Sequence, residues 1–251
     1  MESLRYPTAT TPADSRAGAA ARAQPRSPLQ LMLHLVLWLL LSLGLTILLE
    51  WAGITWWWPE QGVAHVQQTL REDSAYLSTD LRRSAFVQDA QAYAAWVGAW
   101  GYRILWEWTG LRRAVAWAAE APPQSTTLRQ RIQAFYRTHL SEYVITAAYA
   151  TQVFLQRLAI LTLALPVFVL AATLGLVDGI NLRRLRRWGG GRESSFVYHH
   201  TKRLIWPVFV LPWSLYLAMP VSLHPAWIVL PMAGVLGLLL AVAASRFKKH
   251  L

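Results

Sequence analysis

The stretch LAILTLALPVFVLAATLGLV, residues 158–177, contains no ionisable side chain. A helix needs about 20 apolar residues to cross about 30 Å of hydrocarbon, so this stretch predicts a membrane span. Three other stretches have the same character. They are residues 29–49, where His34 is the one titratable group, and residues 204–223 and 226–244, which have none. The sequence therefore predicts an all-α, polytopic membrane protein with four transmembrane helices.

The composition agrees with this class. Of the 251 residues 55% are hydrophobic and 15% are charged, whereas soluble domains average about 45–50% and about 25%. Fourteen residues are Trp, the side chain that favours the membrane–water interface. The chain has no cysteine, which excludes disulfides, thiolate metal sites and a cysteine nucleophile.

The distribution of charge predicts the orientation in the membrane. Segments 1–28, 178–203 and 245–251 together carry 14 of the 24 Lys and Arg residues and 4 of the 13 acidic residues. Segment 50–157 is nearly neutral, with 10 basic and 9 acidic residues. Cytoplasmic segments accumulate Lys and Arg, so we expect a multi-pass protein with both termini in the cytoplasm. The net charge of +11 then reports topology, and we do not expect direct nucleic-acid binding.

The chain on the cytoplasmic side falls into three predicted pieces. Residues 1–28 contain four prolines and many small polar residues, a composition that predicts a disordered tail. The apolar region of the first span is longer than the apolar region of a cleavable signal peptide, so we expect the span to be retained as a signal anchor. Residues 178–203 form a basic cytoplasmic loop, and residues 245–251 form a basic C-terminus.

Residues 50–157 are predicted to form a helical periplasmic segment between spans one and two. The run 56–58 is three consecutive Trp residues, which indicates an interfacial aromatic belt. Pro59 suits the first turn of a helix, which we expect to extend to about Arg82. No stretch shows the alternation typical of a β-strand.

Two further helices are expected in this segment. Apolar residues recur every three or four positions over residues 86–120, which predicts a helix that ends before Pro122. Ser125 or Thr126 can cap the next helix, which we expect to run into the second span. Arg157 is the one charged residue from residue 143 to residue 177. As a helix, this stretch would be about 52 Å long, which exceeds one crossing of the membrane. We therefore expect Gln152, Gln156 and Arg157 near the membrane interface.

The helix over 86–120 carries an aromatic stripe that includes Trp96, Trp100 and Trp108. One interpretation is an internal core between the long helices of this chain. The other is a docking face for a second subunit or for the bilayer surface, because a helix with too few neighbours exposes such a patch. The three Trp side chains are therefore candidate contact residues for a partner or for lipid.

We find no pattern that predicts catalysis, a cofactor site or a metal site, so we expect a non-enzymatic protein without cofactors. Known nucleophile, zinc-protease and phosphate-loop motifs are absent from the sequence. Arginines in the cytoplasmic loop can contact anionic lipid headgroups, or they can form a docking site for an ATPase or a DNA–protein complex. The candidate contact residues there are Arg183, Arg184, Arg186, Arg187, Arg192 and Glu193.

Four stretches of the chain resemble the integrating conjugative element membrane protein family of bacteria. The stretches are Glu50-Trp51 with WPEQG at 58–62, LVDG at 176–179 with the arginines after it, GRESSFVYH at 191–199, and LPW through PVSLHP at 211–225 on to FKK at 247–249. The resemblance implies the inner (cytoplasmic) membrane of a Gram-negative bacterium. It also implies a gene cluster for conjugative transfer, near the coupling ATPase of a type IV secretion machine, and supplies no catalytic residues.

Our leading hypothesis is thus an inner-membrane subunit of the transfer apparatus of an integrative conjugative element. Its expected partners are the membrane, anionic lipid at the basic loop, and other transfer-apparatus subunits, with the coupling ATPase as one candidate. Two alternatives stay open. One is a membrane-embedded enzyme that uses Arg192, Glu193, His199 and His200, and the other is a small transporter or immunity protein carried by the mobile element.

Overall fold

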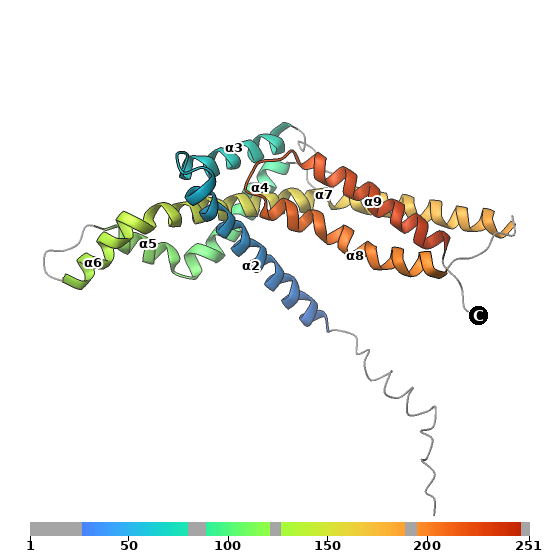
Figure 1. Ribbon diagram of the computed structural model, residues 1–251, viewed down its shortest axis with the longest axis horizontal. Helices are drawn as coiled ribbons and strands as arrows, with labels where there is room; N and C mark the ends of the chain where they lie inside the picture. The colour runs from blue at the N-terminus through green and yellow to red at the C-terminus, as the bar shows by residue number, and fades with distance from the viewer. Residues whose placement is uncertain (1–26, 80–88, 121–126, 189–194, 247–251) are drawn as a thin grey trace, which may run out of the picture. The chain divides into compact units, whose positions relative to one another are not determined.

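The computed structural model describes residues 27–79, 89–120, 127–188 and 195–246, and in these ranges all regular structure is helical (Figure 1). Residues 1–26, most of the predicted disordered tail, lie outside the described residues. The elements are α2 (Pro28–Ala52), η1 (Gly53–Trp57), α3 (Val63–Thr79), α4 (Ala90–Tyr102), η2 (Arg103–Trp108), α5 (Leu111–Ala119), α6 (Thr127–Phe135), η3 (Tyr136–Leu140), α7 (Ser141–Trp188), α8 (Ser195–Ala218) and α9 (Pro225–Ser245). The three η elements are π-helical turns.

The chain divides into two compact units, residues 1–41 and 42–251. The described part of the first unit is the beginning of α2, where most side chains are exposed and apolar. The second unit holds the end of α2 and all the other helices, and the contacts that follow belong to it.

Three helices are long and apolar enough to cross a membrane: Pro28–Trp57, Ser141–Leu185 and Pro225–Ser245. They contain the first, second and fourth predicted spans. The prediction for residues 204–223 is wrong at its C-terminal end, because α8 ends at Ala218 and residues 219–224 form a non-helical loop. Pro220 explains this end, since a proline disfavours helical backbone in the residue before it and donates no hydrogen bond itself.

Helices α7 and α9 run side by side in the same direction, and α8 runs the opposite way between them in the chain (Figure 1). Their backbones approach closely because small residues face each other. A Cβ atom added at Gly175 would overlap the carbonyl oxygen of Gly237, and one added at Gly179 would overlap that of Ala241. Small residues four apart are typical of closely packed membrane helices.

The helices before α7 pack along its first half. Val66 of α3 is fully buried against Ala150 and Val153 of α7. Helix α4 runs antiparallel to α7, with the hydroxyl oxygens of Tyr93 and Thr162 3.1 Å apart. These contacts attach the predicted periplasmic helices to one half of α7.

Two predicted helix boundaries in this segment are wrong. The helix expected to begin at Pro59 begins at Val63, after a turn that includes Gly62 at a φ of 49°. The helix expected over residues 86–120 is interrupted before α5, because Gly110 has a φ of 76°. Glycine takes this left-handed conformation without the steric cost that a Cβ imposes.

The predicted continuation of a helix into the second span is confirmed. Elements α6, η3 and α7 follow one another without a break from Thr127 to Trp188. The candidate capping residues Ser125 and Thr126 lie outside the described residues.

Candidate functional site

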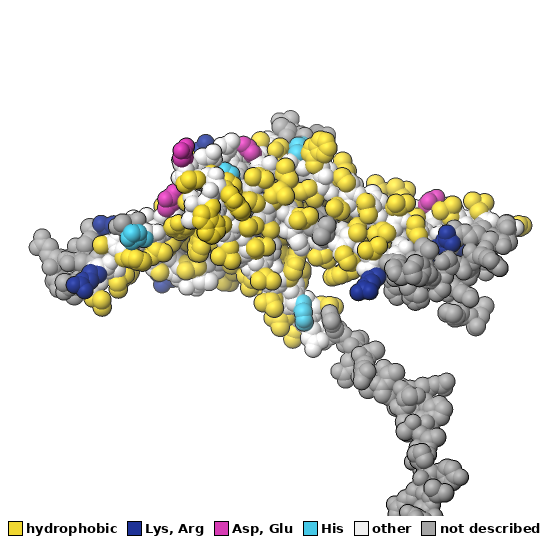
Figure 2. Space-filling view, in the orientation of Figure 1, with side chains coloured by type: hydrophobic (Ala, Val, Ile, Leu, Met, Phe, Trp, Pro, Cys, Tyr) yellow, Lys and Arg dark blue, Asp and Glu magenta, His cyan; other side chains and the backbone are white. Residues whose placement is uncertain are grey.

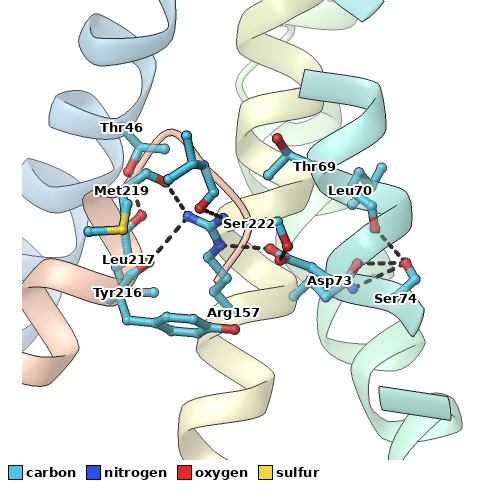
Figure 3. Close-up of polar contacts among 12 residues, drawn as sticks. Thr46, Thr69, Leu70, Asp73, Ser74, Arg157, Tyr216, Leu217, Met219 and Ser222 are labelled. Atoms are coloured by element: carbon cyan, nitrogen blue, oxygen red, sulfur yellow. Dashed lines mark hydrogen bonds and ion pairs between the residues drawn. The ribbon is translucent and has the colours of Figure 1, made fainter. Parts of the chain in front are cut away.

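A buried ion pair joins α3 to α7. The Arg157 Nε atom donates a hydrogen bond of 2.7 Å to Asp73 Oδ2, and both side chains are 0% exposed (Figure 3). Removing two charges from water costs several kcal/mol per ion unless further hydrogen bonds satisfy them. The structure supplies such bonds on both sides of the pair.

The rest of the Arg157 guanidinium binds the end of α8 and the loop after it. Nη1 donates to the carbonyl oxygens of Tyr216, at 3.2 Å, and of Met219, and Nη2 donates to that of Val221 at 2.9 Å. Carbonyls at a helix C-terminus lack partners within the helix and favour a nearby positive charge. Arg157 therefore acts as the C-terminal cap of α8, where Pro220 prevents the helix from continuing.

The Asp73 carboxylate has a second donor in the same loop. Ser222 Oγ donates a 2.6 Å hydrogen bond to Asp73 Oδ1. Burial raises the pKa of Asp73, while the Arg157 guanidinium and the Ser222 hydroxyl oppose that shift. We call these groups, namely the Asp73, Arg157 and Ser222 side chains with the carbonyls of Tyr216, Met219 and Val221, the Asp73–Arg157 cluster.

A separate bond ties the end of α2 to the same region. Thr46 Oγ1 donates to the carbonyl oxygen of Leu217 at 3.0 Å. The cluster and this bond together connect α2, α3, α7 and the α8–α9 loop. Because its charged groups are buried and hydrogen-bonded, the cluster is suited to fixing these elements relative to one another.

Ser222→Ala should destabilise the protein, because it leaves one oxygen of the buried Asp73 carboxylate without a donor. The expected loss in free energy of unfolding is about 1–3 kcal/mol. Thermal unfolding of the purified protein measures it. Ser214→Ala is the matched control, since the Ser214 hydroxyl binds only the Val210 carbonyl of its own helix among the bonds described. Equal melting temperatures for the two variants would contradict the role assigned to Ser222.

A second group of polar side chains, half-buried except for the buried Glu50, joins the residues from Glu50 to Trp58 to α3. The Trp58 ring stacks on the His65 ring, with centroids 4.0 Å apart, and His65 Nδ1 lies 3.6 Å from Glu50 Oε2. A Cβ at Gly53 would overlap the Trp58 ring. Burial lowers the pKa of His65, opposed by the carboxylate of Glu72, so the neutral imidazole is favoured here.

Of the predicted contact residues in the basic loop, the structure describes the side chains of Arg183 and Arg184. Arg183 is half-buried and Arg184 is exposed, both in the last turns of α7. Arg186 and Arg187 also lie in α7, but their side chains are outside the described part of the structure, as are residues Arg192 and Glu193. Within the described ranges, no three His, Asp or Glu side chains are placed to hold a metal ion.

The predicted tryptophan contacts are exposed. Trp96 and Trp100 of α4 are 57% and 42% exposed, and Trp108 at the end of η2 is 69% exposed. These three side chains do not lie in an internal core, whereas Trp106 is buried at 8% exposed. Contact with a partner or with lipid stays a prediction for the exposed three.

The Asp73–Arg157 cluster is the feature that sequence reasoning missed. The signal was present in Arg157, the one charge between residues 143 and 177. A charge within such an apolar stretch requires a partner. Its expected position near the membrane interface stays a prediction, and the structure shows in addition that its side chain is buried against Asp73. Nothing in the sequence distinguishes Asp73 from the other acids of its segment.

Comparison with known proteins gives one finding. A family model described as "DtrJ-like: IncC plasmid conjugative DNA transfer protein DtrJ-like" matches residues 57–248. This range is about three quarters of the chain and contains the whole Asp73–Arg157 cluster. No curated protein and no solved structure matches the chain.

Proposed function

This chain belongs to the DtrJ-like family of conjugative DNA transfer proteins, and from that premise we propose that it is a non-enzymatic, integral membrane subunit of a conjugative transfer apparatus. Involvement in conjugative DNA transfer follows from the family and agrees with what the resemblance implied. Membership of the integrating conjugative element membrane protein family itself stays a prediction. The bacterial inner membrane and a type IV secretion machine are the proposed location and context.

The direction of α7 and α9 is the observation that carries the membrane proposal. Two parallel helices can both cross a bilayer only if the chain crosses back between them, and α8 is the helix between them in the chain. The apolar part of α8, Arg203–Ala218, is about 24 Å long and shorter than the three candidate spans. We assign the return crossing to this part of α8 together with the loop after it, and the first crossing to α2, which makes four crossings.

Basic residues orient this arrangement. Arg183 and Arg184 at the end of α7, Arg203 near the start of α8 and Arg246 after α9 belong to the same end of the three helices. In Figure 2, hydrophobic side chains cover the middle of the visible face of α8 and α9, and basic side chains lie near the end of these helices that carries the arginines. Short cytoplasmic segments are enriched in Lys and Arg, so we place this end, with both termini, in the cytoplasm.

The two sides of the membrane then offer different contacts. The arginines of residues 183–203 face anionic lipid headgroups and the coupling ATPase. Helices α3 to α6 lie outside the membrane, with exposed Trp108 directed to periplasmic subunits. The absence of a recognised catalytic motif supports a role in assembly over a chemical one.

Site-specific photocrosslinking in donor cells tests this proposal. A photoreactive amino acid at Arg184 or Arg203, both exposed, should capture the coupling ATPase or another transfer subunit. The same amino acid at exposed Val169 of α7 is the control and should yield lipid adducts. Deleting the gene should abolish transfer in a mating assay, and a plasmid copy should restore it. Normal transfer after deletion, or no captured transfer subunit, would refute the proposal.

A further inference from the structure

A cavity of about 210 Å³ lies between α7 and α9 beside the end of α3. We call it the α7–α9 groove. Ala164 of α7 and Ala226 of α9 contribute only small side chains to its walls. Its remaining walls are formed by Tyr76, Ile160, Leu163, Val167, His224, Pro225, Val229 and Leu230.

The groove is apolar along its length and polar at one end. The α7 residues on its wall are 160, 163, 164 and 167, which form one helical stripe about 10 Å long. The polar side chains of the lining are Tyr76 and His224, whose rings are 4.8 Å apart. His224 precedes α9, so this polar pair marks the outer end of the groove in the proposed orientation.

The chemistry of the walls selects the occupant. A bound water needs two to four polar partners, and apolar cavities bind small apolar molecules instead, so the mainly apolar lining of the groove favours an apolar ligand. None of the described residues that line the groove carries a full charge as Lys, Arg, Asp or Glu does, which disfavours an ionic ligand inside it. An elongated apolar ligand with a polar group at its outer end fits both the shape and the lining.

The position of the groove indicates the source of such a ligand. Leu230 on its wall is 58% exposed, and Trp227, three residues earlier on the same helical face, is 79% exposed. Exposed Trp is enriched at the membrane–water interface, and exposed Leu suits the acyl region. The groove thus lies at the outer end of the proposed spans α7 and α9 and runs parallel to them. The acyl chains of outer-leaflet lipids occupy the same depth and have the same direction.

We propose that the α7–α9 groove binds one acyl chain of an outer-leaflet phospholipid, with the headgroup next to Tyr76 and Trp227. The proposal rests on the membrane placement given above. The bound chain fills space that the alanines leave open and makes the lipid part of the contact between α7 and α9.

Phospholipid retention tests the groove directly. The full chain is reconstituted in phosphatidylethanolamine–phosphatidylglycerol vesicles and extracted in mild detergent, and retained phospholipid is counted by native mass spectrometry. Ala164→Phe places a ring in the groove and should lower retention on the order of tenfold, the change that about 1.4 kcal/mol produces. Leu174→Phe, at a site 61% exposed on α7 outside the groove, should retain lipid like the parent. Equal retention by both variants, or none by the parent, would overturn the proposal.

A second measurement needs no variant. A phospholipid with a photoreactive group in its acyl chain should label residues 160–167 and 225–230 of the parent protein more strongly than the exposed face of α8. Labelling spread evenly over the apolar helices would refute the groove and leave the membrane proposal standing. Labelling of none of the helices would refute the membrane placement itself, and preferred capture of a protein at the groove would replace the lipid as occupant.

Discussion

Asp73→Ala is expected to lower the free energy of unfolding by about 3–5 kcal/mol, because it leaves the Arg157 charge buried without a carboxylate. The pair is 0% exposed, so solvent cannot replace the missing partner without opening the contact between α3 and α7. The Ser222 hydroxyl would lose its acceptor as well. Most single-domain proteins have only about 5–15 kcal/mol of stability, so we expect much less folded protein in the membrane.

Thermal unfolding in detergent and the yield of monodisperse protein measure this effect. Arg71→Ala is the control, because Arg71 is an exposed charge on the same helix and its loss should change stability little. The double variant Asp73→Leu with Arg157→Met should lose less stability than the two single losses added together, since no unpaired charge is left buried. Strict additivity would show that the two side chains do not stabilise each other.

Gly175→Ala is expected to destabilise the contact between α7 and α9 by about 1–3 kcal/mol. The new methyl group would overlap the carbonyl oxygen of Gly237, which is backbone and cannot rotate away. The two helices must therefore move apart and lose the contacts that small residues allow. Gly175→Leu should separate them further and prevent recovery of the folded protein.

Gly234→Ala provides a control with the opposite sign. No atom of the described ranges lies within 4 Å of a Cβ at this position of α9, and alanine favours a helix over glycine by up to about 1 kcal/mol. Melting temperature should fall for Gly175→Ala and stay equal or rise for Gly234→Ala. A fall of the same size in both would mean that helix propensity, rather than the close approach, decides the outcome.

The helices were largely predictable because their signals are local. Long apolar stretches predicted α2, α7 and α9, and the continuous helix into α7 was predicted from residues 143–177, where Arg157 is the one charged residue. The boundaries were less predictable because they depend on single residues. Pro220 ends α8, and Gly110 ends the helix over 86–120, each through its own backbone geometry.

The Asp73–Arg157 cluster and the close approach of Gly175 to Gly237 were not predictable, for a different physical reason. Both depend on residues far apart in the chain, and residue type does not reveal which ones meet. Arg157 required some partner, but the segment before it offered nine acidic residues. Gly175 and Gly237 are likewise ordinary residues of apolar helices until α7 and α9 are placed in the same direction.

The sequence separations in the cluster have a consequence for biosynthesis. Arg157 follows Asp73 by 84 residues, and Ser222 follows it by 149. Until the ribosome has made α8 and the loop after it, the Asp73 carboxylate has no serine to bind and Arg157 has no helix end to cap. The contact of α3 with α7 and the α8–α9 loop therefore cannot reach its final stability before translation is nearly complete. A nascent chain released early would be a ready substrate for membrane proteases.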